Sequence, residues 1–449
     1  MSGVVAIKTD DCIFQKLLYS LSSIQHRGQD STGIILSDGF SLNRIKGMGL
    51  VNEVFRETSL EKDNYKIGIG HVRSSPSGCN KDYNIEPLVS FSKNQEFGLA
   101  HDGNLSNYDL LKQALEDEGI SFHTQTDSEL ILLLLARYFE GDIIKAIRKT
   151  MEVIKGAYSC VVTMPDKIIA FRDYHGFRPL MLGMNSDNVV VSSENAAIEI
   201  LDIEDYRDFE PGEIIVIDDE GVHSYPAEKE ISKKHCVFES VYIARPDANV
   251  ENVNSYMFRR RCGEVLYRQA PVKADLVCPV PDSSTPSAIG FAQESGIPFA
   301  EGLVKNRYMG RTFIKPSQKE RDLAVKLKLS PQKSVVDGKS IVLVDDSIVR
   351  GTTSAKLIQR MRKAGAKEVH FRVTSPPFMY PCYYGVDTPD RKNLIAANLS
   401  KEEIRKQIGA DSLEFIDLDS MLNLLENKDN YCNACFTGDY PVKKDEIWI

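Results

Sequence analysis

The segment Ile341–Thr353, IVLVDDSIVRGTT, joins an apolar run to two acids, a loop of small residues and two threonines. The apolar run predicts a buried strand, and apolar spacing over Thr352–Ala364 predicts a helix after it. Ligands of parallel sheets lie at the carboxyl ends of strands, and helix N-termini attract anions. We therefore expect the backbone N–H groups from Ser347 to Thr353 to wrap a phosphate.

Asp345 and Asp346 lie at the end of this strand, beside the predicted phosphate loop. Carboxylates in that position can accept from sugar hydroxyls and attract Mg²⁺. The alternative is a capped helix after a core strand, with the acids as a solvated turn, but the complete 341–353 run favours the phosphate site. The predicted substrate-binding residues are Ser347, Arg350, Gly351, Thr352 and Thr353, and the predicted magnesium residues are Ser283, Asp345 and Asp346.

Two neighbouring segments favour pyrophosphate binding. Pro279–Ser284, PVPDSS, follows a predicted strand, and Lys305–Pro316 is a basic segment. Its cations include Lys305, Arg307 and Arg311. A basic surface loop is the alternative, but in an acidic chain a cluster beside a phosphate motif indicates a clamp. Together the three segments resemble the binding signature and lid of type I phosphoribosyltransferases, which use 5-phosphoribosyl-1-pyrophosphate (PRPP).

Four cysteines form a second candidate centre. Cys432 and Cys435 make a C-x-x-C pair near the end of the chain, and Cys236 and Cys382 complete a set of four thiolates. Four thiolates suffice for a tetrahedral metal or a cubane cluster, but the spacing alone leaves zinc, iron–sulfur and redox chemistry open. The remaining cysteines are interpreted as core or incidental thiols: Cys12, Cys79, Cys160, Cys262 and Cys278.

The polar segment Tyr225–Lys234 divides the chain into two predicted domains, residues 1–230 and 231–449. Before it, strand-like runs dominate, with helical patterns over Phe14–Ser23 and Thr126–Phe139, which predicts an α+β layered fold. After it, strands and helices alternate, which predicts a parallel α/β sheet.

The composition of the 449-residue chain excludes several classes of function. A formal charge of −9 argues against general nucleic-acid binding. Since no apolar run reaches the roughly 18 residues that a membrane span needs, we expect no membrane insertion. The N-terminus lacks the features of a signal peptide, so we expect a cytoplasmic protein whose cysteines are reduced.

Nearly the whole chain resembles the glutamine PRPP amidotransferase (amidophosphoribosyltransferase) family. Besides the segments above, the matching motifs are HRGQDS at 26–31, GHVR at 70–73, RDYHGFRPL at 172–180 and YIARPD at 242–247. The resemblance implies an α+β N-terminal-nucleophile (αββα) glutaminase-like domain followed by an α/β type I phosphoribosyltransferase domain. In the family, ammonia from the first domain reacts with PRPP in the second to give 5-phosphoribosylamine, in the first committed step of purine synthesis.

The resemblance also implies cofactors and partners. One subclass binds a [4Fe-4S] cluster through cysteines in the contexts CVFE, PPxxxPCYYGVD and CNACF, and all three contexts occur here. That subclass makes Cys236, Cys382, Cys432 and Cys435 the expected cluster ligands. Because family members are usually oligomeric and inhibited by nucleotides, we expect a homo-oligomer that binds purine nucleotides.

The sequence departs from the family pattern at two glutaminase positions. The family begins Met-Cys-Gly, whereas this chain begins Met1-Ser2-Gly3, and a hydroxyl is a weaker nucleophile than a thiolate. The family's His-Asn-Gly-Asn is here His101-Asp102-Gly103-Asn104, and an ionised Asp only accepts hydrogen bonds. Losing one oxyanion donor costs about 10²–10³ in rate. We therefore predict that glutamine hydrolysis is lost or very slow and that ammonia is the donor.

The expected glutamine-binding residues are retained. The resemblance assigns Arg73 to the α-carboxylate of glutamine and Asp127 to its α-amine, with surface ion pairing as the alternative. His26 and His101 are interpreted as structural, and Glu194 is given no chemistry. Two rival functions remain open: a catalytically silent regulator that binds PRPP or nucleotides beside an active paralogue, and a transferase that uses another acceptor.

Overall fold

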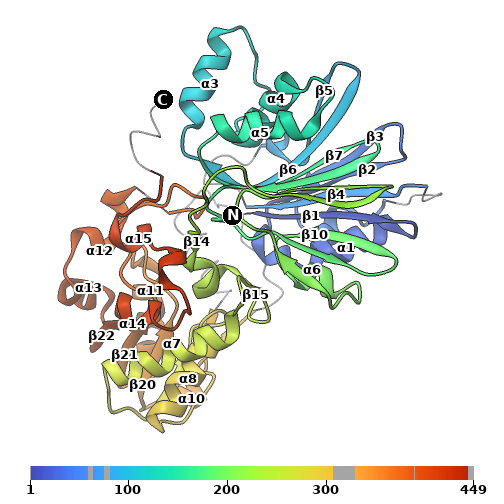
Figure 1. The fold of residues 1–449 in the computed structure, drawn as a ribbon. Helices are drawn as coiled ribbons and strands as arrows, with labels where there is room; N and C mark the ends of the chain where they lie inside the picture. Colours follow the sequence, from blue (N-terminus) through green and yellow to red (C-terminus); the bar gives the residue numbers. More distant parts are fainter. Residues whose placement is uncertain (1, 59–63, 75–80, 307–328, 389, 443–449) are drawn as a thin grey trace. The chain divides into compact units, whose positions relative to one another are not determined.

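The computed structural model describes residues 2–58, 64–74, 81–306, 329–388 and 390–442. They form two compact units (Figure 1). The first consists of Met1–Cys236, Tyr383–Asp387 and Tyr440–Ile449, and the second of Val237–Cys382 and Thr388–Asp439. The predicted domain boundary at residue 230 falls near the end of the first unit's main segment. The two short later segments of that unit have no counterpart in the predicted division.

The first unit contains two antiparallel sheets. In spatial order, the seven-stranded sheet is β11 (Tyr206–Asp208), β9 (Met181–Met184), β10 (Asn188–Ser192), β1 (Ser2–Thr9), β4 (Ile67–Arg73), β2 (Ser31–Ser37) and β3 (Leu42–Met48). The six-stranded sheet is β13 (Gly221–Tyr225), β12 (Ile214–Asp218), β8 (Lys167–Arg172), β7 (Gly156–Met164), β6 (Gln95–Leu105) and β5 (Leu88–Ser92).

Alternation along β1 explains how the layers stack. Val5 and Ile7 pack in a cluster with α1 (Ile13–Ser23), whereas Val4 and Ala6 pack in the core between the sheets. Successive strand side chains point to opposite faces, so one strand serves both layers. The first sheet is covered by α1, α2 (Val51–Val54) and α6 (Ala196–Glu199), and the second by α3 (Tyr108–Asp117), α4 (Asp127–Tyr138) and α5 (Ile143–Val153). The predicted αββα fold is confirmed.

The two later segments of the first unit pack beside its polar loops. Tyr384 stacks on Phe177, with ring centroids 4.1 Å apart and planes 13° apart. The Asn104 side-chain amide donates to the carbonyl of Tyr383 at 3.0 Å, and Tyr383 also contacts the ring of Tyr440. Residues from the last sixth of the chain thus complete a unit formed mainly by the first half.

The second unit is built on a parallel sheet, as the alternating pattern predicted. Its strands lie in the order β17 (Leu276–Pro279), β20 (Ser340–Asp345), β21 (Glu368–Val373) and β22 (Ser412–Phe415). The longer helices are α7 (Ser255–Gln269), α8 (Thr285–Ser295), α11 (Thr352–Lys363) and α13 (Lys401–Ile408). Helix α11 buries Leu357, Ile358 and Met361 in the sheet's core cluster, in agreement with the predicted helical spacing.

Helices α7 and α8 pack too closely for side chains at two glycines. A Cβ at Gly263 would lie 1.9 Å from the Ser287 carbonyl oxygen, and one at Gly290 would lie 2.0 Å from that of Arg260. Both approaches are far inside van der Waals contact, so only glycine fits. This packing fixes α8, whose first residues follow the strand-end loop after β17.

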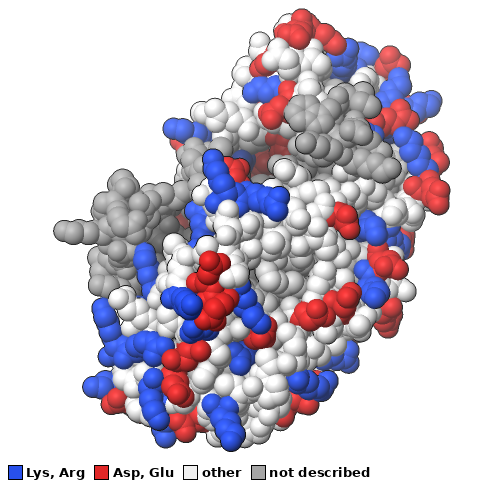
Figure 2. All heavy atoms as spheres, turned by 90° about the vertical axis from the view of Figure 1, so that its left-hand side faces the viewer, with Lys and Arg blue, Asp and Glu red and all other residues white. Residues whose placement is uncertain are grey.

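Shorter elements complete the fold: α10 (Lys333–Val336), α12 (Ile395–Asn398), α14 (Leu418–Leu422), α15 (Ala434–Thr437), β14 (His235–Cys236), β15 (Asn249–Val250), β16 (Val253–Asn254), β18 (Leu303–Lys305), β19 (Leu329–Pro331) and β23 (Tyr431–Cys432). On the face drawn in Figure 2, Lys and Arg are interspersed with Asp and Glu. Within the described ranges, no helix has the length and apolar character needed to cross a membrane.

Candidate functional site

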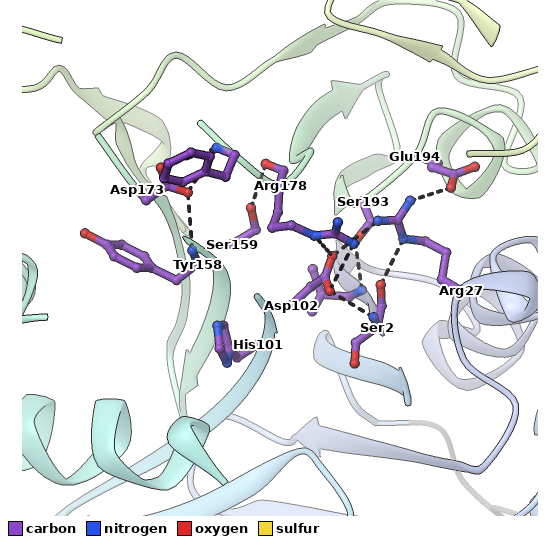
Figure 3. Close-up of polar contacts among 12 residues, drawn as sticks. Ser2, Arg27, His101, Asp102, Tyr158, Ser159, Asp173, Arg178, Ser193 and Glu194 are labelled. Carbon is purple, nitrogen blue, oxygen red and sulfur yellow. Dashed lines mark hydrogen bonds and ion pairs between the residues drawn. The ribbon is translucent and has the colours of Figure 1, made fainter. Parts of the chain in front are cut away.

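The first polar site lies at the start of β1, where Ser2 meets the opposite sheet. The backbone N–H of Ser2 donates to Oδ1 of Asp102 on β6 at 2.9 Å. The Ser2 carbonyl accepts from Nε of Arg27 at 2.9 Å. Arg27 belongs to the short helical turn η1 (Gln25–Arg27) that follows α1. The predicted nucleophile position and Asp102 are therefore in direct contact (Figure 3).

Asp102 is a buried, ionised hydrogen-bond acceptor. Its Oδ2 accepts from Nη2 of Arg27 at 3.2 Å and from Nε of Arg178 at 3.1 Å. Burial by itself raises the pKa of Asp102, but the charges of Arg178 and Arg27 outweigh it and hold the pKa well below its ordinary value. A carboxylate in this state has no proton to donate.

Glu194, just after β10, extends the network on the far side of Arg27. Its Oε1 accepts from Nη1 of Arg27 at 2.6 Å and lies 2.8 Å from Nε2 of His26. Although burial opposes the shift, His26 and Arg27 lower the pKa of Glu194 to about 2. No role was assigned to Glu194 from the sequence. The sequence did not predict that Arg27 binds both Glu194 and Asp102.

The 172–180 loop, RDYHGFRPL, explains the position of Arg178, to which no role was assigned from the sequence. The carboxylate of Asp173 accepts from three backbone N–H groups at 2.9–3.3 Å. The guanidinium of Arg172 donates to three backbone carbonyls, including that of Arg178, each at 2.7 Å. Two buried side chains thereby fix the loop and point Arg178 at Asp102. The quoted family motif was the signal available in the sequence.

Gly103 follows Asp102 where only glycine is possible. Its φ is +155°, and a Cβ there would lie 2.0 Å from the carbonyl oxygen of Ala157. The preceding residue is held by Glu86, whose Oε2 accepts from the His101 N–H at 3.0 Å. Ser128 donates to Oε1 of Glu86 at 2.8 Å and lies 3.2 Å from Nδ1 of His101. Glu86 thus fixes the backbone before Asp102 and Gly103, and the structural role of the His101 ring remains a prediction.

The predicted glutamine-binding residues lie in the same unit. Arg73, the last residue of β4, is the register partner of Ser2 and donates to the carbonyl of Asn84. Asp127, the first residue of α4, accepts from the Leu105 N–H at 2.9 Å. The strand pairing therefore brings Arg73 beside Ser2. The roles of Arg73 and Asp127 toward glutamine remain predictions.

The second polar site lies at the carboxyl ends of β17 and β20. Pro279 and Val344 are register partners, so the loops that follow these strands are neighbours. The hydroxyl of Ser283 donates to Oδ2 of Asp346 at 2.5 Å, which joins the two loops. Ser347 donates to the other carboxylate oxygen of Asp346 at 2.7 Å. The structure thus brings together all three predicted magnesium residues.

The Asp345–Asp346 pair fits a divalent cation. Burial and the neighbouring Asp346 carboxylate raise the pKa of Asp345, and burial raises the pKa of Asp346. A bound cation would relieve both costs, because it stabilises the charged forms. The donor set, carboxylate and hydroxyl oxygen, is the type that Mg²⁺ prefers.

The predicted phosphate loop ends at the N-terminus of α11. Gly351, the residue before the helix, has φ +72°, and a Cβ there would lie 2.5 Å from a methyl group of Ile395. The N-cap residue is this glycine, which has no side chain to cap the helix, and Thr352 and Thr353 are exposed. The first N–H groups of α11 are the type of donor that binds phosphate. Ser347 and Arg350 lie on the same loop, between β20 and α11.

The basic segment is only partly described. Lys305, at the end of β18, forms an ion pair with Asp282 in the loop after β17, which brings it to the strand-end site. Arg307 and Arg311 lie outside the described residues. Their assignment to a pyrophosphate clamp remains a prediction.

Three of the four predicted cluster cysteines belong to the second unit. The backbone carbonyl of Cys435 accepts from the N–H groups of Met379 at 3.0 Å and Tyr380 at 3.1 Å, so the C-x-x-C turn packs on the segment that carries Cys382. Cys236 ends the main segment of the first unit. Across the part of the chain that is described, no group of three or more His, Cys, Asp or Glu side chains is arranged to hold a metal ion. The cluster remains a prediction.

Two domain families match the two units. Residues 71–199 match the glutamine amidotransferase domain, and residues 259–375 match the phosphoribosyl transferase domain. The chain is 46% identical to the amidophosphoribosyltransferase of Methanocaldococcus jannaschii, over 96% of this chain and 95% of that protein. It is 43% identical to the amidophosphoribosyltransferase of Bacillus subtilis, over 98% of this chain and 94% of that protein.

Two solved structures are similar over nearly their whole length. One, described as the allosteric regulatory enzyme of purine biosynthesis, has a TM-score of 0.92 and 42% identity and covers 99% of this chain and 97% of its own. The other is the glutamine PRPP amidotransferase from B. subtilis complexed with ADP and GMP. Its TM-score is 0.91 and its identity 42%, over 98% of this chain and 97% of its own.

The Glu194 network predicts a pH-dependent stability. The pKa of Glu194 is about 2 in the folded protein, whereas a Glu in an unfolded chain has a pKa near ~4.3. Its ion pairs therefore stabilise the folded state fully above about pH 5. That stabilisation is lost as the pH falls from there through about 2. Glu194→Gln should lower the free energy of unfolding by about 3 kcal/mol near neutral pH.

Urea unfolding of both proteins between about pH 7 and about pH 3 measures the difference, which should shrink as the pH falls. Glu220→Gln, which changes an exposed carboxylate, is the matched control and should show little difference at any pH. A Glu194→Gln penalty that stays constant across this range would contradict the ion-pair account.

Proposed function

Because the chain belongs to the amidophosphoribosyltransferase family, we propose that it makes 5-phosphoribosylamine from PRPP with ammonia as donor, its own glutamine hydrolysis being lost or very slow. The chain is an enzyme of the glycosyltransferase type. The observation that supports the finer proposal is the contact between ionised Asp102 and the nitrogen of Ser2, the two positions at which the resemblance implies Asn and Cys.

Both departures weaken the same reaction step. Attack on the glutamine amide needs a strong nucleophile at residue 2 and hydrogen-bond donors for the oxyanion that forms. Ser2 supplies a hydroxyl, and Asp102 supplies an acceptor whose two oxygens are already bound by Arg27 and Arg178. Gly103 keeps its backbone N–H, so part of the oxyanion site remains.

In the phosphoribosyl half, we propose that the loop from Ser347 to Thr353 binds the phosphate of PRPP through backbone N–H groups at the start of α11. Asp345 and Asp346 would face the ribose and, with Ser283, hold Mg²⁺. The metal would supply positive charge to the departing pyrophosphate. Lys305, Arg307 and Arg311 would add charge on the same group and keep water from the reacting carbon.

The partners follow from the same proposal. PRPP and ammonia, free or supplied by another protein, would be the substrates, and Arg73 and Asp127 would bind glutamine without efficient cleavage. The similar B. subtilis enzyme is described with ADP and GMP, which supports binding of inhibitory purine nucleotides here. We expect a cytoplasmic homo-oligomer. The silent-regulator alternative is disfavoured because the relatives that match nearly the whole chain are amidophosphoribosyltransferases.

We further propose that Cys236, Cys382, Cys432 and Cys435 hold a [4Fe-4S] cluster. Four cysteine thiolates are the donor set for such a cluster, and the sequence contexts are those of the cluster-containing subclass. The hydrogen bonds from Met379 and Tyr380 to Cys435 support a shared site for Cys382 and Cys435.

A two-donor assay tests the proposed reaction. Pyrophosphate release from PRPP with Mg²⁺, measured under anaerobic conditions, should be rapid with ammonium. With glutamine it should be slower by about 10² or more, because a nucleophile and an oxyanion donor are both changed. The similar B. subtilis enzyme serves as the positive control for glutamine. Comparable rates with the two donors would refute the loss of glutamine hydrolysis.

Asp346→Asn tests the metal-binding role of the acid pair. Replacing one anionic oxygen by an amide should weaken Mg²⁺-dependent PRPP binding by about 10- to 100-fold, as titration calorimetry can measure. The control Asp419→Asn changes an exposed acid at the start of α14 and should bind normally. Equal affinity of Asp346→Asn and the unchanged protein would show that PRPP binding does not depend on this pair.

Iron analysis tests the cluster. Protein purified anaerobically should be brown and contain iron and acid-labile sulfide in equal amounts, whereas Cys435→Ser should lose most of both. Cys12→Ser, which changes an exposed cysteine at the start of α1, is the control and should keep them. A colourless preparation that contains zinc would overturn the assignment.

A further inference from the structure

The nitrogen atom of Ser2 is the atom that Asp102 contacts. In an N-terminal nucleophile the nitrogen of the first residue is an α-amine, which takes the proton of the attacking hydroxyl or thiol. Here the same atom lies 2.9 Å from a buried carboxylate oxygen. The contact therefore joins the position of a general base to a permanent negative charge.

The charges around this contact come from several elements. Asp102 approaches from β6, Arg27 from η1 and Arg178 from the loop after β8. Arg73 on β4 is the register partner of Ser2 and lies 3.5 Å from the carboxylate of Glu86. One contact further out, Glu194 binds Arg27 and His26.

The sum of these charges influences whether an amine at Ser2 is protonated. Two arginines face two acids, Asp102 and Glu194, and Arg73 faces Glu86. Replacing Asp102 by Asn would make the charge of the same pocket more positive by one and would disfavour an ammonium ion. With Asp102, the pocket presents a carboxylate acceptor at hydrogen-bond distance from the nitrogen of Ser2.

We propose that Asp102 holds the α-nitrogen of Ser2 as an ammonium ion in the mature chain, so that this nitrogen cannot act as the base for glutamine hydrolysis. Maturation is hydrolysis of the Met1–Ser2 peptide bond by water, which releases methionine and leaves the new amine on Ser2. Its lone pair then carries a proton that is hydrogen-bonded to Asp102. The inference rests on the proposed loss of glutamine hydrolysis and assigns that loss to Asp102 as well as to Ser2.

This assignment predicts how substitutions at residues 2 and 102 combine in restoring glutamine hydrolysis. A thiol at position 2 still needs an acceptor for its proton and donors for the oxyanion. Ser2→Cys alone therefore restores little, whereas Ser2→Cys with Asp102→Asn restores both the neutral amine and a side-chain N–H donor. The two changes are expected to be strongly non-additive.

Four full-length chains test this prediction. Each is released from a cleavable fusion so that residue 2 is its first residue. Glutamate release from glutamine is measured for the unchanged chain, Ser2→Cys, Asp102→Asn and the double variant. The gain of Ser2→Cys over the unchanged chain should stay below about tenfold, and the double variant should exceed Ser2→Cys by about 10². A cooperative thermal transition in each protein shows that it is folded.

The outcomes separate the two proposals. Glutamine hydrolysis by Ser2→Cys equal to that of the double variant would overturn the role of Asp102 and leave the proposed ammonia-dependent reaction intact. Fast hydrolysis by the unchanged chain would overturn the proposed function itself.

A second measurement follows the protonation of the Ser2 amine directly. Ser2 is partly exposed, and mass spectrometry can follow, against pH, the rate at which a small acylating reagent modifies its amine. The midpoint should lie about one unit or more above the ~7.7–8.0 of an ordinary α-amine, and Asp102→Asn should lower it. The exposed Lys145 serves as the internal control. A midpoint at or below the ordinary value in the unchanged chain would contradict the ammonium assignment.

Discussion

A carboxylate removed from water must be paired, and the first unit is organised around that requirement at Asp102. Two guanidinium groups, from Arg27 and Arg178, reach it from separate segments. Each arginine is in turn fixed, Arg27 by Glu194 and the Ser2 carbonyl, Arg178 by the loop that Arg172 and Asp173 hold. An unpaired charge at this depth would cost several kcal/mol, so the ion pairs determine how these segments meet.

In the second unit, hydroxyl groups rather than guanidinium groups bind the buried acid. Asp346 is held by two hydroxyls, those of Ser283 and Ser347, and Asp345 lies directly beside it. Hydroxyls satisfy the geometry of a carboxylate but add no positive charge, so burial raises the pKa of both acids. Perturbed acids at a strand-end loop are typical of a binding site. Within one chain, compensated acids hold a structure together and uncompensated acids are available to a cation.

Local patterns predicted the elements well. The helix expected at Thr352–Ala364 is Thr352–Lys363, and the one expected at Thr126–Phe139 is Asp127–Tyr138, because apolar spacing and helix ends are encoded over short stretches. The acid pair and phosphate loop were predicted for the same reason. The partners of Asp102 were not, because Arg27 and Arg178 lie 75 and 76 residues away and the motifs that contain them do not indicate which side chain they contact. Such pairings depend on how two sheets stack.

The aromatic contact between Phe177 and Tyr384 has a consequence for how the protein is made. Phe177 lies in the loop that positions Arg178, and its stacking partner is synthesised about two hundred residues later. The first half of the chain leaves the ribosome with this apolar surface uncovered and without the segment that reaches Asn104. The glutaminase-like unit can therefore form all its contacts only after most of the other unit has been translated. A gene that encoded the first half alone would produce a fragment in which Phe177 lacks its stacking partner.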